Sequence, residues 1–258
     1  MLESISQDQP RPAKVAPSWA ETEMITDRPD QTESSITVPH KTLQIETGFV
    51  FESYSTESVD FQDWGIGTTL LRYGLLPNLE LRLGSFYQYS ELEFGNAMDS
   101  TQQGIGPVTG GLKVFIADED GWRPQLSLLA DITLSDAGEN YFRPSYSYTT
   151  IKILASHTLS ETLGLGYNLG YANNGEDPGG MFVYSLVLGA SLTNRLSAFA
   201  EVYGTFDDRE LPRHRIDGGF TFLLMNNLQL DVSAGLGPED DGVSMWFGNA
   251  GVSWRIPR

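Results

Sequence analysis

The feature that most constrains this chain is a strict alternation of apolar and polar residues. In residues 79–84, three leucines alternate with Glu80, Arg82 and a glycine, directly after a turn signal at Pro77 and Asn78. Because a strand has a side-chain period of two, the leucines share one face and the charged residues share the other. A soluble sandwich would cover the leucines with a second sheet, whereas a membrane barrel would turn them to lipid and the charges to its lumen.

The same alternation recurs along the chain from residue 42 to its end. We count about twelve such segments of roughly ten residues, which is the length of a tilted strand that crosses a bilayer. Connections after even-numbered segments are short, and those after odd-numbered segments, such as residues 91–107, are longer and more polar. This parity is typical of outer-membrane barrels with tight periplasmic turns. We therefore expect an all-β fold: a closed antiparallel transmembrane β-barrel of about 12 strands over residues 41–258, with both termini periplasmic.

Composition excludes several classes of protein. The net charge of -18 argues against a nucleic-acid partner, since phosphate binding needs a basic surface. The absence of cysteine excludes disulfides and thiolate metal sites. The sequence has no apolar run near the ~20 residues of a membrane helix. Met1 is followed by acidic and polar residues and not by a signal peptide, so we expect an exported chain in its mature form.

The face opposite the apolar one carries charges of both signs. Charges at that density cannot face lipid, but they can pair with each other or face water in a lumen. Two interpretations stay open, an internal salt-bridge network that holds a narrow barrel rigid and a lining that selects solutes. The predicted lumen-lining residues are Glu46, Arg72, Glu80, Arg82, Lys113, Arg123, Asp131, Lys152, Glu201, Asp217, Asp231 and Arg255.

Residues 1–40 form no clear element, because five prolines interrupt them. Residues 24–39 are polar and extended, and a segment rich in proline cannot add to a sheet. We expect an extended periplasmic segment in which Asp27, Arg28, Pro29 and Asp30, within residues 25–34, act as a plug or gate. A disordered leader is the alternative.

Several stretches carry a family likeness. Residues 25–34, followed by residues 38–46, form an N-terminal signature, and residues 71–84 form a first hairpin. Residues 111–124 fit a second hairpin, and Trp254-Arg255 fits the end of the barrel. These stretches resemble the outer-membrane barrel family labelled "putative MetA-pathway of phenol degradation". The resemblance implies a Gram-negative outer membrane and passage of small solutes, aromatic or hydrophobic ones included. The chain departs from many such barrels because it does not end in an aromatic residue.

The sequence shows no catalytic or metal-binding motif. Its three histidines, His40, His157 and His214, lack metal-ligand spacing, so we expect no metal, no cofactor and no enzyme activity. The nearest approach to a catalytic pair is His157 beside Ser156 and Ser160, where hydroxyls are also ordinary strand-end residues.

The sequence favours a porin-like channel or transporter for small solutes. Its expected partners are outer-membrane lipid and lipopolysaccharide, a small-molecule solute, and proteins that bind the loops or the N-terminal segment. One alternative is a structural or accessory barrel subunit that transports nothing and has an occluded lumen. A barrel enzyme that modifies lipid and a soluble β-sandwich are weaker alternatives.

Overall fold

The computed structural model describes residues 23–95, 97–173, 175–176, 179–206, 213–240 and 242–256. Within these ranges the regular structure is entirely β, and no helix is long and apolar enough to cross a membrane. Of the expected N-terminal segment, residues 1–22 lie outside the described part of the chain.

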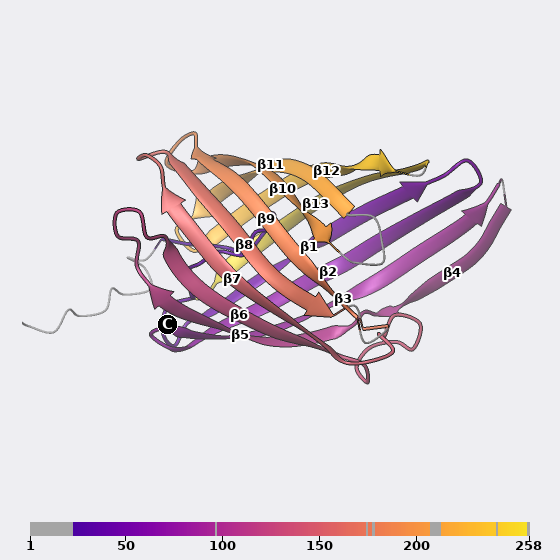
Figure 1. The fold of residues 1–258 in the computed structure, drawn as a ribbon, viewed down its shortest axis with the longest axis horizontal. Helices are drawn as coiled ribbons and strands as arrows, with labels where there is room; N and C mark the ends of the chain where they lie inside the picture. The colour runs from indigo at the N-terminus through magenta and orange to yellow at the C-terminus, as the bar shows by residue number, and fades with distance from the viewer. Residues whose placement is uncertain are drawn as a thin grey trace, which may run out of the picture.

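Thirteen strands follow one another along the described residues. They are β1 (Leu43–Ser55), β2 (Val59–Leu76), β3 (Leu79–Phe94), β4 (Ala97–Ile105), β5 (Val108–Ala117), β6 (Gln125–Leu134), β7 (Tyr148–Thr158), β8 (Leu163–Asn173), β9 (Gly180–Ser191), β10 (Leu196–Phe206), β11 (Arg213–Met225), β12 (Leu228–Asp240) and β13 (Val243–Arg255). All strands except β4 form one antiparallel ring (Figure 1), which closes where Gln44 of β1 lies opposite Arg255 of β13. The predicted closed barrel of about 12 strands is confirmed.

The barrel is inverted relative to a soluble protein. Its outer face is apolar, and side chains such as Leu83, Leu169 and Phe220 are at least half exposed. Its interior is polar. Among the described residues, the three largest fully buried side chains are those of Arg72, Arg255 and Lys113. Since apolar residues normally fill the interior of a soluble domain, this arrangement is that of a barrel whose outer face meets lipid.

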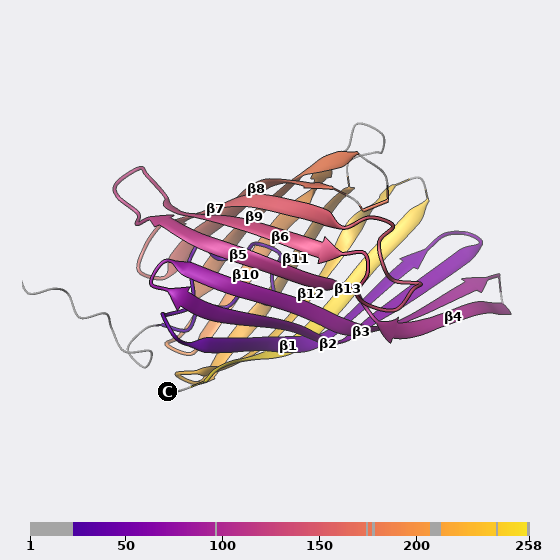
Figure 2. The same cartoon turned by 90° about the horizontal axis from the view of Figure 1, so that it is seen from below.

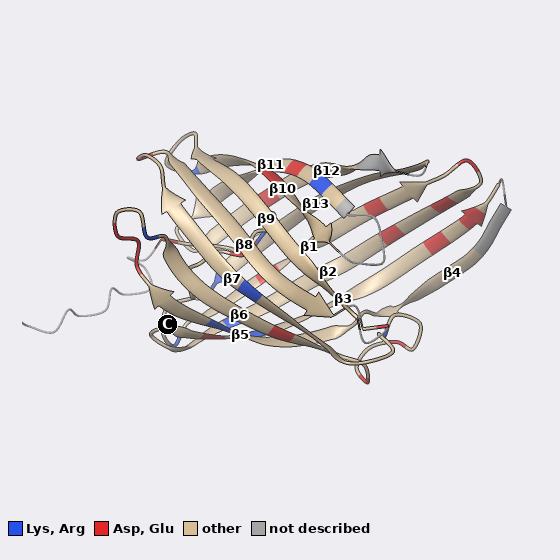
Figure 3. Cartoon of the chain, viewed as in Figure 1, with Lys and Arg blue, Asp and Glu red and all other residues tan. Residues whose placement is uncertain are grey.

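The two ends of the barrel differ. Tight turns lie at one end, which we call the turn end, and they include residues 77–78 and residues 226–227. The last strand also finishes there, since the N–H of Arg255 donates to the carbonyl of Asn227 at 2.9 Å. At the opposite, open end, β1, β2 and β3 extend beyond the rest of the ring and carry several acidic residues (Figure 3). The predicted parity of the connections therefore separates two ends of different structure.

The predicted loop at residues 91–107 is wrong, because most of it is strand. β3 continues to Phe94, and β4 (Ala97–Ile105) returns along it with Ile105 opposite Tyr87. β4 pairs with β3 alone among the described strands, and it projects at the open end (Figure 1). Residues 100–104 of β4 are polar on both faces, so the apolar alternation that identifies a membrane strand is missing there.

The chain enters the ring through a sharp reversal before β1. Lys41 has a φ of 61°, and its N–H donates to the carbonyl of Gly74 on β2 at 2.6 Å. The carbonyls of Val38 and Pro39 pack directly on the Cα of Gly74, where any side chain would clash with them. A glycine is therefore needed at position 74 for the chain to turn inward.

Candidate functional site

Residues 23–42, which we call the N-terminal segment, lie inside the barrel at its turn end (Figure 2). The segment forms hydrogen bonds to side chains on several sides of the ring. The N–H of Val38 donates to Glu80 on β3, the N–H of Glu33 donates to Asn168 on β8, and the hydroxyls of Thr32 and of Ser185 on β9 are hydrogen-bonded to each other. β8 and β9 are neighbours, but β3 lies four strands away from β8 around the ring, so the segment has to cross the lumen to reach all three.

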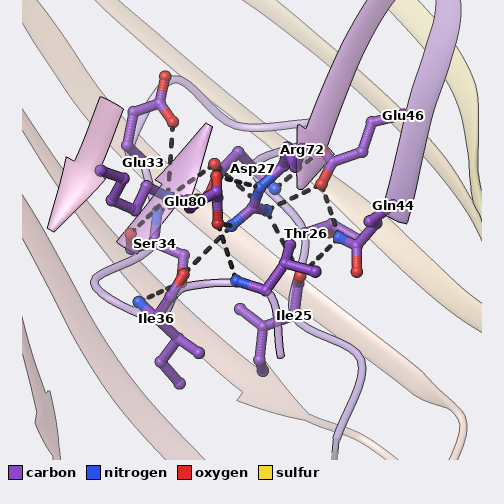
Figure 4. A network of polar contacts seen from close by, with 12 residues as sticks. Ile25, Thr26, Asp27, Glu33, Ser34, Ile36, Gln44, Glu46, Arg72 and Glu80 are labelled. Carbon is purple, nitrogen blue, oxygen red and sulfur yellow. Dashed lines mark hydrogen bonds and ion pairs between the residues drawn. The ribbon is translucent and has the colours of Figure 1, made fainter. Parts of the chain in front are cut away.

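One carboxylate, that of Asp27, holds the segment to the wall (Figure 4). It lies 3.2 Å from Arg72 of β2, 2.5 Å from Arg82 of β3 and 2.7 Å from Lys113 of β5. We call these three residues the cation cluster. Three neighbouring strands thus direct their only inward cations at a single group of the N-terminal segment, among the described residues.

Further carboxylates pair with the residues of the cation cluster. Arg72 lies 2.8 Å from both Glu46 and Glu80, and Arg82 lies 2.7 Å from Glu33 of the N-terminal segment. Backbone groups add to the network, because Lys113 donates to the carbonyl of Ser34 at 2.9 Å. Buried charges are tolerated only when they are paired and hydrogen-bonded in this way.

The position of Asp27 determines its ionisation. It lies in the N-terminal segment, outside the membrane-spanning strands, and its side chain is fully buried. Burial alone would raise the pKa of its carboxyl, but Arg72, Lys113 and Arg82 outweigh burial and hold that pKa well below its usual range. The carboxylate is therefore charged throughout the physiological pH range.

The opposite side of the lumen has the reverse charge. We call Glu201 of β10, Asp217 of β11 and Asp231 of β12 the acidic wall. Among the described residues, no comparable group of three cations faces them. Glu201 accepts hydrogen bonds from the N–H of Gln31 at 2.7 Å and from the hydroxyl of Thr32 at 2.5 Å. Neither buried oxygen of Asp217, which lies opposite Glu201, accepts a hydrogen bond from a described residue.

Two further residues of the N-terminal segment face the acidic wall. Arg28 reaches Asp231 at 3.2 Å and forms an ion pair with it. Burial, followed by the negative charge of Glu201, raises the pKa of Asp30 well above its usual range. The segment is thus held by strong ion pairs on one side and mainly by neutral donors on the other.

Of the remaining predicted residues, three lie with the lumen network and one lies outside it. Asp131 lies 3.9 Å from Arg82, and Arg255 donates to Gln44 at 2.9 Å and to the carbonyl of Glu23. Lys152 is an electrostatic neighbour of Asp131 on the inward face of β7.

Arg123 does not join these residues. Its side chain is 53% exposed in the turn before β6, where it pairs with Asp120. Arg123 precedes the first ladder position of its strand, so the alternation that places the others inward does not reach it.

The sequence did not reveal the neutral wall residues that contact the segment, among them Gln44, Asn168 and Asn249. A usable signal exists for Asn168. It stands in an inward row of β8 that otherwise consists of three glycines and Ala172, and a Cβ at one of these glycines, Gly166, would lie 3.3 Å from Thr32. A strand whose inward positions carry almost no side chains indicates that something else fills that space.

A cavity remains beside the segment at the turn end. It has a volume of about 560 Å³ and lies between residues 23–36 and the turn-end parts of β6–β12. No group of three or more His, Asp or Glu side chains in the described part of the chain is arranged to hold a metal ion.

The fold and the apolar outer face define an outer-membrane β-barrel. The model of the family "Putative MetA-pathway of phenol degradation" matches residues 26–256, and the chain belongs to that family. The match begins within the N-terminal segment, one residue before Asp27. No curated protein sequence matches the chain.

Solved structures share the architecture at low sequence identity. The COG4313 outer membrane channel from Pseudomonas putida F1 aligns with a TM-score of 0.64 and 11% identity, over 85% of this chain and 97% of that one. The translocator domain of the autotransporter NalP from Neisseria meningitidis aligns with a TM-score of 0.55 and 13% identity, over 84% and 89%. The β domain of the Bordetella autotransporter BrkA gives 0.54 and 13%, over 84% and 100%. At these identities the likeness concerns the fold.

Proposed function

We propose that the protein is a channel for small solutes in the outer membrane of a Gram-negative bacterium, with the N-terminal segment as its plug. Small aromatic or hydrophobic molecules are the favoured solutes, because the family is described by phenol degradation and the COG4313 relative is titled an outer membrane channel. The turn end faces the periplasm in this proposal, since tight turns lie there in barrels of this type.

The observation that carries this proposal is the cavity of about 560 Å³ that remains alongside the N-terminal segment. A barrel that serves only as a scaffold can fill its lumen completely with its own side chains. Here paired charges fill the space around Arg72, Arg82 and Lys113, whereas the larger cavity remains beside β8 and β9, where inward positions include glycines. A route past a segment bound on one side is what a plugged channel requires.

The rival is an accessory barrel with an occluded lumen. It is favoured by the complete burial of Arg72, Lys113 and Leu154 at the turn end, which indicates tight packing there. A lipid-modifying enzyme has less support, because His157 faces outward to Tyr167 and Glu119 while Ser156 faces inward to Ser35. His157 and Ser156 therefore lie on opposite faces of β7 and cannot act together. The outer face would contact lipid and lipopolysaccharide in either case.

Conductance in planar bilayers tests the proposal. Refolded protein should give discrete, salt-dependent openings, and protein that lacks residues 1–40 should give larger ones, because the plug is gone. A barrel that folds but stays silent in both forms would contradict the channel and support the accessory subunit. Heat-modifiable migration in detergent gels establishes that each sample is folded.

A further inference from the structure

Two separate cavities meet at a single side chain, that of Arg28. The larger one is the cavity beside β6–β12 described above. A smaller one, of about 260 Å³, lies on the other side of the lumen between β2, β3 and the start of β5. The side chain of Arg28 therefore borders both cavities.

The smaller cavity, which we call the wall pocket, exists because three strands are irregular at the same height. The pairing of β2 with β3 shifts between Ile66 and Thr69. β3 changes partner there, from β5 at Gly84 to β4 at Tyr87. Between β4 and β5 the chain reads Gly106-Pro107, and proline has no N–H to donate to a ladder. The interrupted ladders leave room within the wall.

The lining of the wall pocket indicates what it can hold. Leu70, Phe86 and Pro107 supply apolar surface, while Thr68 and Arg28 supply hydrogen-bond donors. Drug-sized ligands occupy pockets of roughly 300–1,000 Å³, so this one suits a smaller molecule. A ring or short chain that carries one acceptor oxygen matches both the size and the chemistry.

Arg28 is held loosely compared with its neighbour Asp27. Its Nη1 donates to Thr68 at 3.1 Å, and its Nη2 donates to Asp231 at 3.2 Å and to Asn249 at 3.5 Å. Its Nε is buried without an acceptor among the described residues. The guanidinium therefore has donors to spare and a single carboxylate as its ion-pair partner among the described residues.

The wall is shaped to receive the guanidinium. Gly48 of β1 and Gly251 of β13 lie directly opposite each other, and the guanidinium lies over both. A Cβ added to Gly251 would clash with Nε and Nη2 of Arg28, which are the nearest atoms to it. A single methyl group on the wall would thus displace the side chain while leaving its charge in the protein.

We propose that Arg28 is a movable gate between the two cavities, and that the wall pocket binds a small solute through an acceptor oxygen placed beside Thr68 and the guanidinium. This inference rests on the proposed channel function. A bound acceptor competes with Asp231 and Asn249 for the guanidinium, and displacement from the two glycines opens the passage. Asp27 keeps the N-terminal segment anchored during this movement.

Single-channel recordings in planar bilayers test the gate. Arg28→Ala and Gly251→Ala should each raise the open conductance at least twofold over wild type, because both remove the guanidinium from the passage. Arg195→Ala, which removes an exposed arginine in the turn between β9 and β10, is the matched control and should leave the conductance unchanged.

Block of the current by benzoate tests the pocket, with benzylammonium as a probe that has the same ring and no acceptor. The benzoate concentration for half block should rise at least tenfold in Arg28→Ala, and that for benzylammonium should not rise. If both variants show the same conductance and the same benzoate block as wild type, the proposed gate is overturned, whereas the proposed channel function is not. An unchanged benzoate block in Arg28→Ala overturns the pocket even if the current rises. Silence of all folded proteins would instead overturn the channel itself, and the gate with it.

Discussion

The two sides of the lumen hold the same N-terminal segment in different ways. On the side of β2, β3 and β5, the carboxylate of Asp27 meets the cation cluster at distances of 2.5–3.2 Å. On the side of β10–β12, the acidic wall meets backbone N–H groups, a hydroxyl and Arg28. Buried ion pairs are costly to break once formed, whereas neutral donors can be exchanged for water. The segment is therefore anchored on one side and releasable on the other.

This difference has a consequence for a plugged channel. A plug that is bound equally on all sides must leave the barrel entirely before anything passes. A plug that is anchored on one side can stay in the lumen while a passage forms on the other, where the larger cavity lies. The contrast between the two sides predicts that anchor variants and acidic-wall variants behave differently.

Substitution Asp27→Asn should have the largest effect, because it leaves three buried cations without their shared partner. Removing one partner of a buried ion pair costs about 3–5 kcal/mol, which corresponds to release of the segment roughly 100- to 4,000-fold more often. The chain has no cysteine, so Ser35→Cys provides a single reporter at a position that is only 3% exposed. Maleimide labelling of this cysteine should be faster in Asp27→Asn by that factor.

Asp118→Asn, at an exposed aspartate in the turn between β5 and β6, is the matched control for this experiment. It should label at the wild-type rate. Equal protection of the cysteine in wild type and in Asp27→Asn would show that the cation cluster does not anchor the segment.

Substitution Asp30→Asn should have a smaller effect that depends on pH. Burial and Glu201 raise the pKa of Asp30 in the folded protein above the value of about 3.9 for an unperturbed aspartate. Its stabilising contribution is therefore complete below that value, and it is lost as the pH rises through the raised folded pKa. The amide variant should match wild type in acid and protect the Ser35→Cys reporter better at higher pH, by about tenfold for each unit of pKa difference.

Protection in this experiment is expressed relative to the urea-unfolded chain at the same pH, so that ionisation of the thiol cancels. A wild-type to Asp30→Asn ratio that stays constant with pH would mean that Asp30 does not face the acidic wall in solution.

The sequence predicted the barrel more fully than the site. Period-two alternation identifies each membrane strand, because lipid and lumen impose opposite polarities on alternate residues, and the same alternation placed Arg72, Glu80 and Lys113 inward. It missed β4, whose residues 100–104 are polar on both faces and show no alternation.

Pairing within the site could not be predicted from the sequence. Asp27 lies in a segment with no periodicity, and its partners are 45, 55 and 86 positions further along the chain, on strands brought together only by closure of the ring. Proline content indicated that the segment would not join the sheet, but it did not indicate which carboxylate would face the cations. The inward glycines of β8 carried the clearest unused signal, since they leave the space that the segment occupies.

A disulfide cross-link tests most directly whether the N-terminal segment lies inside the barrel. The hydroxyl oxygens of Thr32 and Ser185 are 2.8 Å apart, so cysteines at both positions of this cysteine-free chain should oxidise to a disulfide in folded protein. A control pair, Thr32→Cys with Ser147→Cys in the loop before β7, should not form one. Efficient cross-linking of the first pair alone is the predicted result. Two free thiols that react fully with maleimide in a folded barrel would contradict the account.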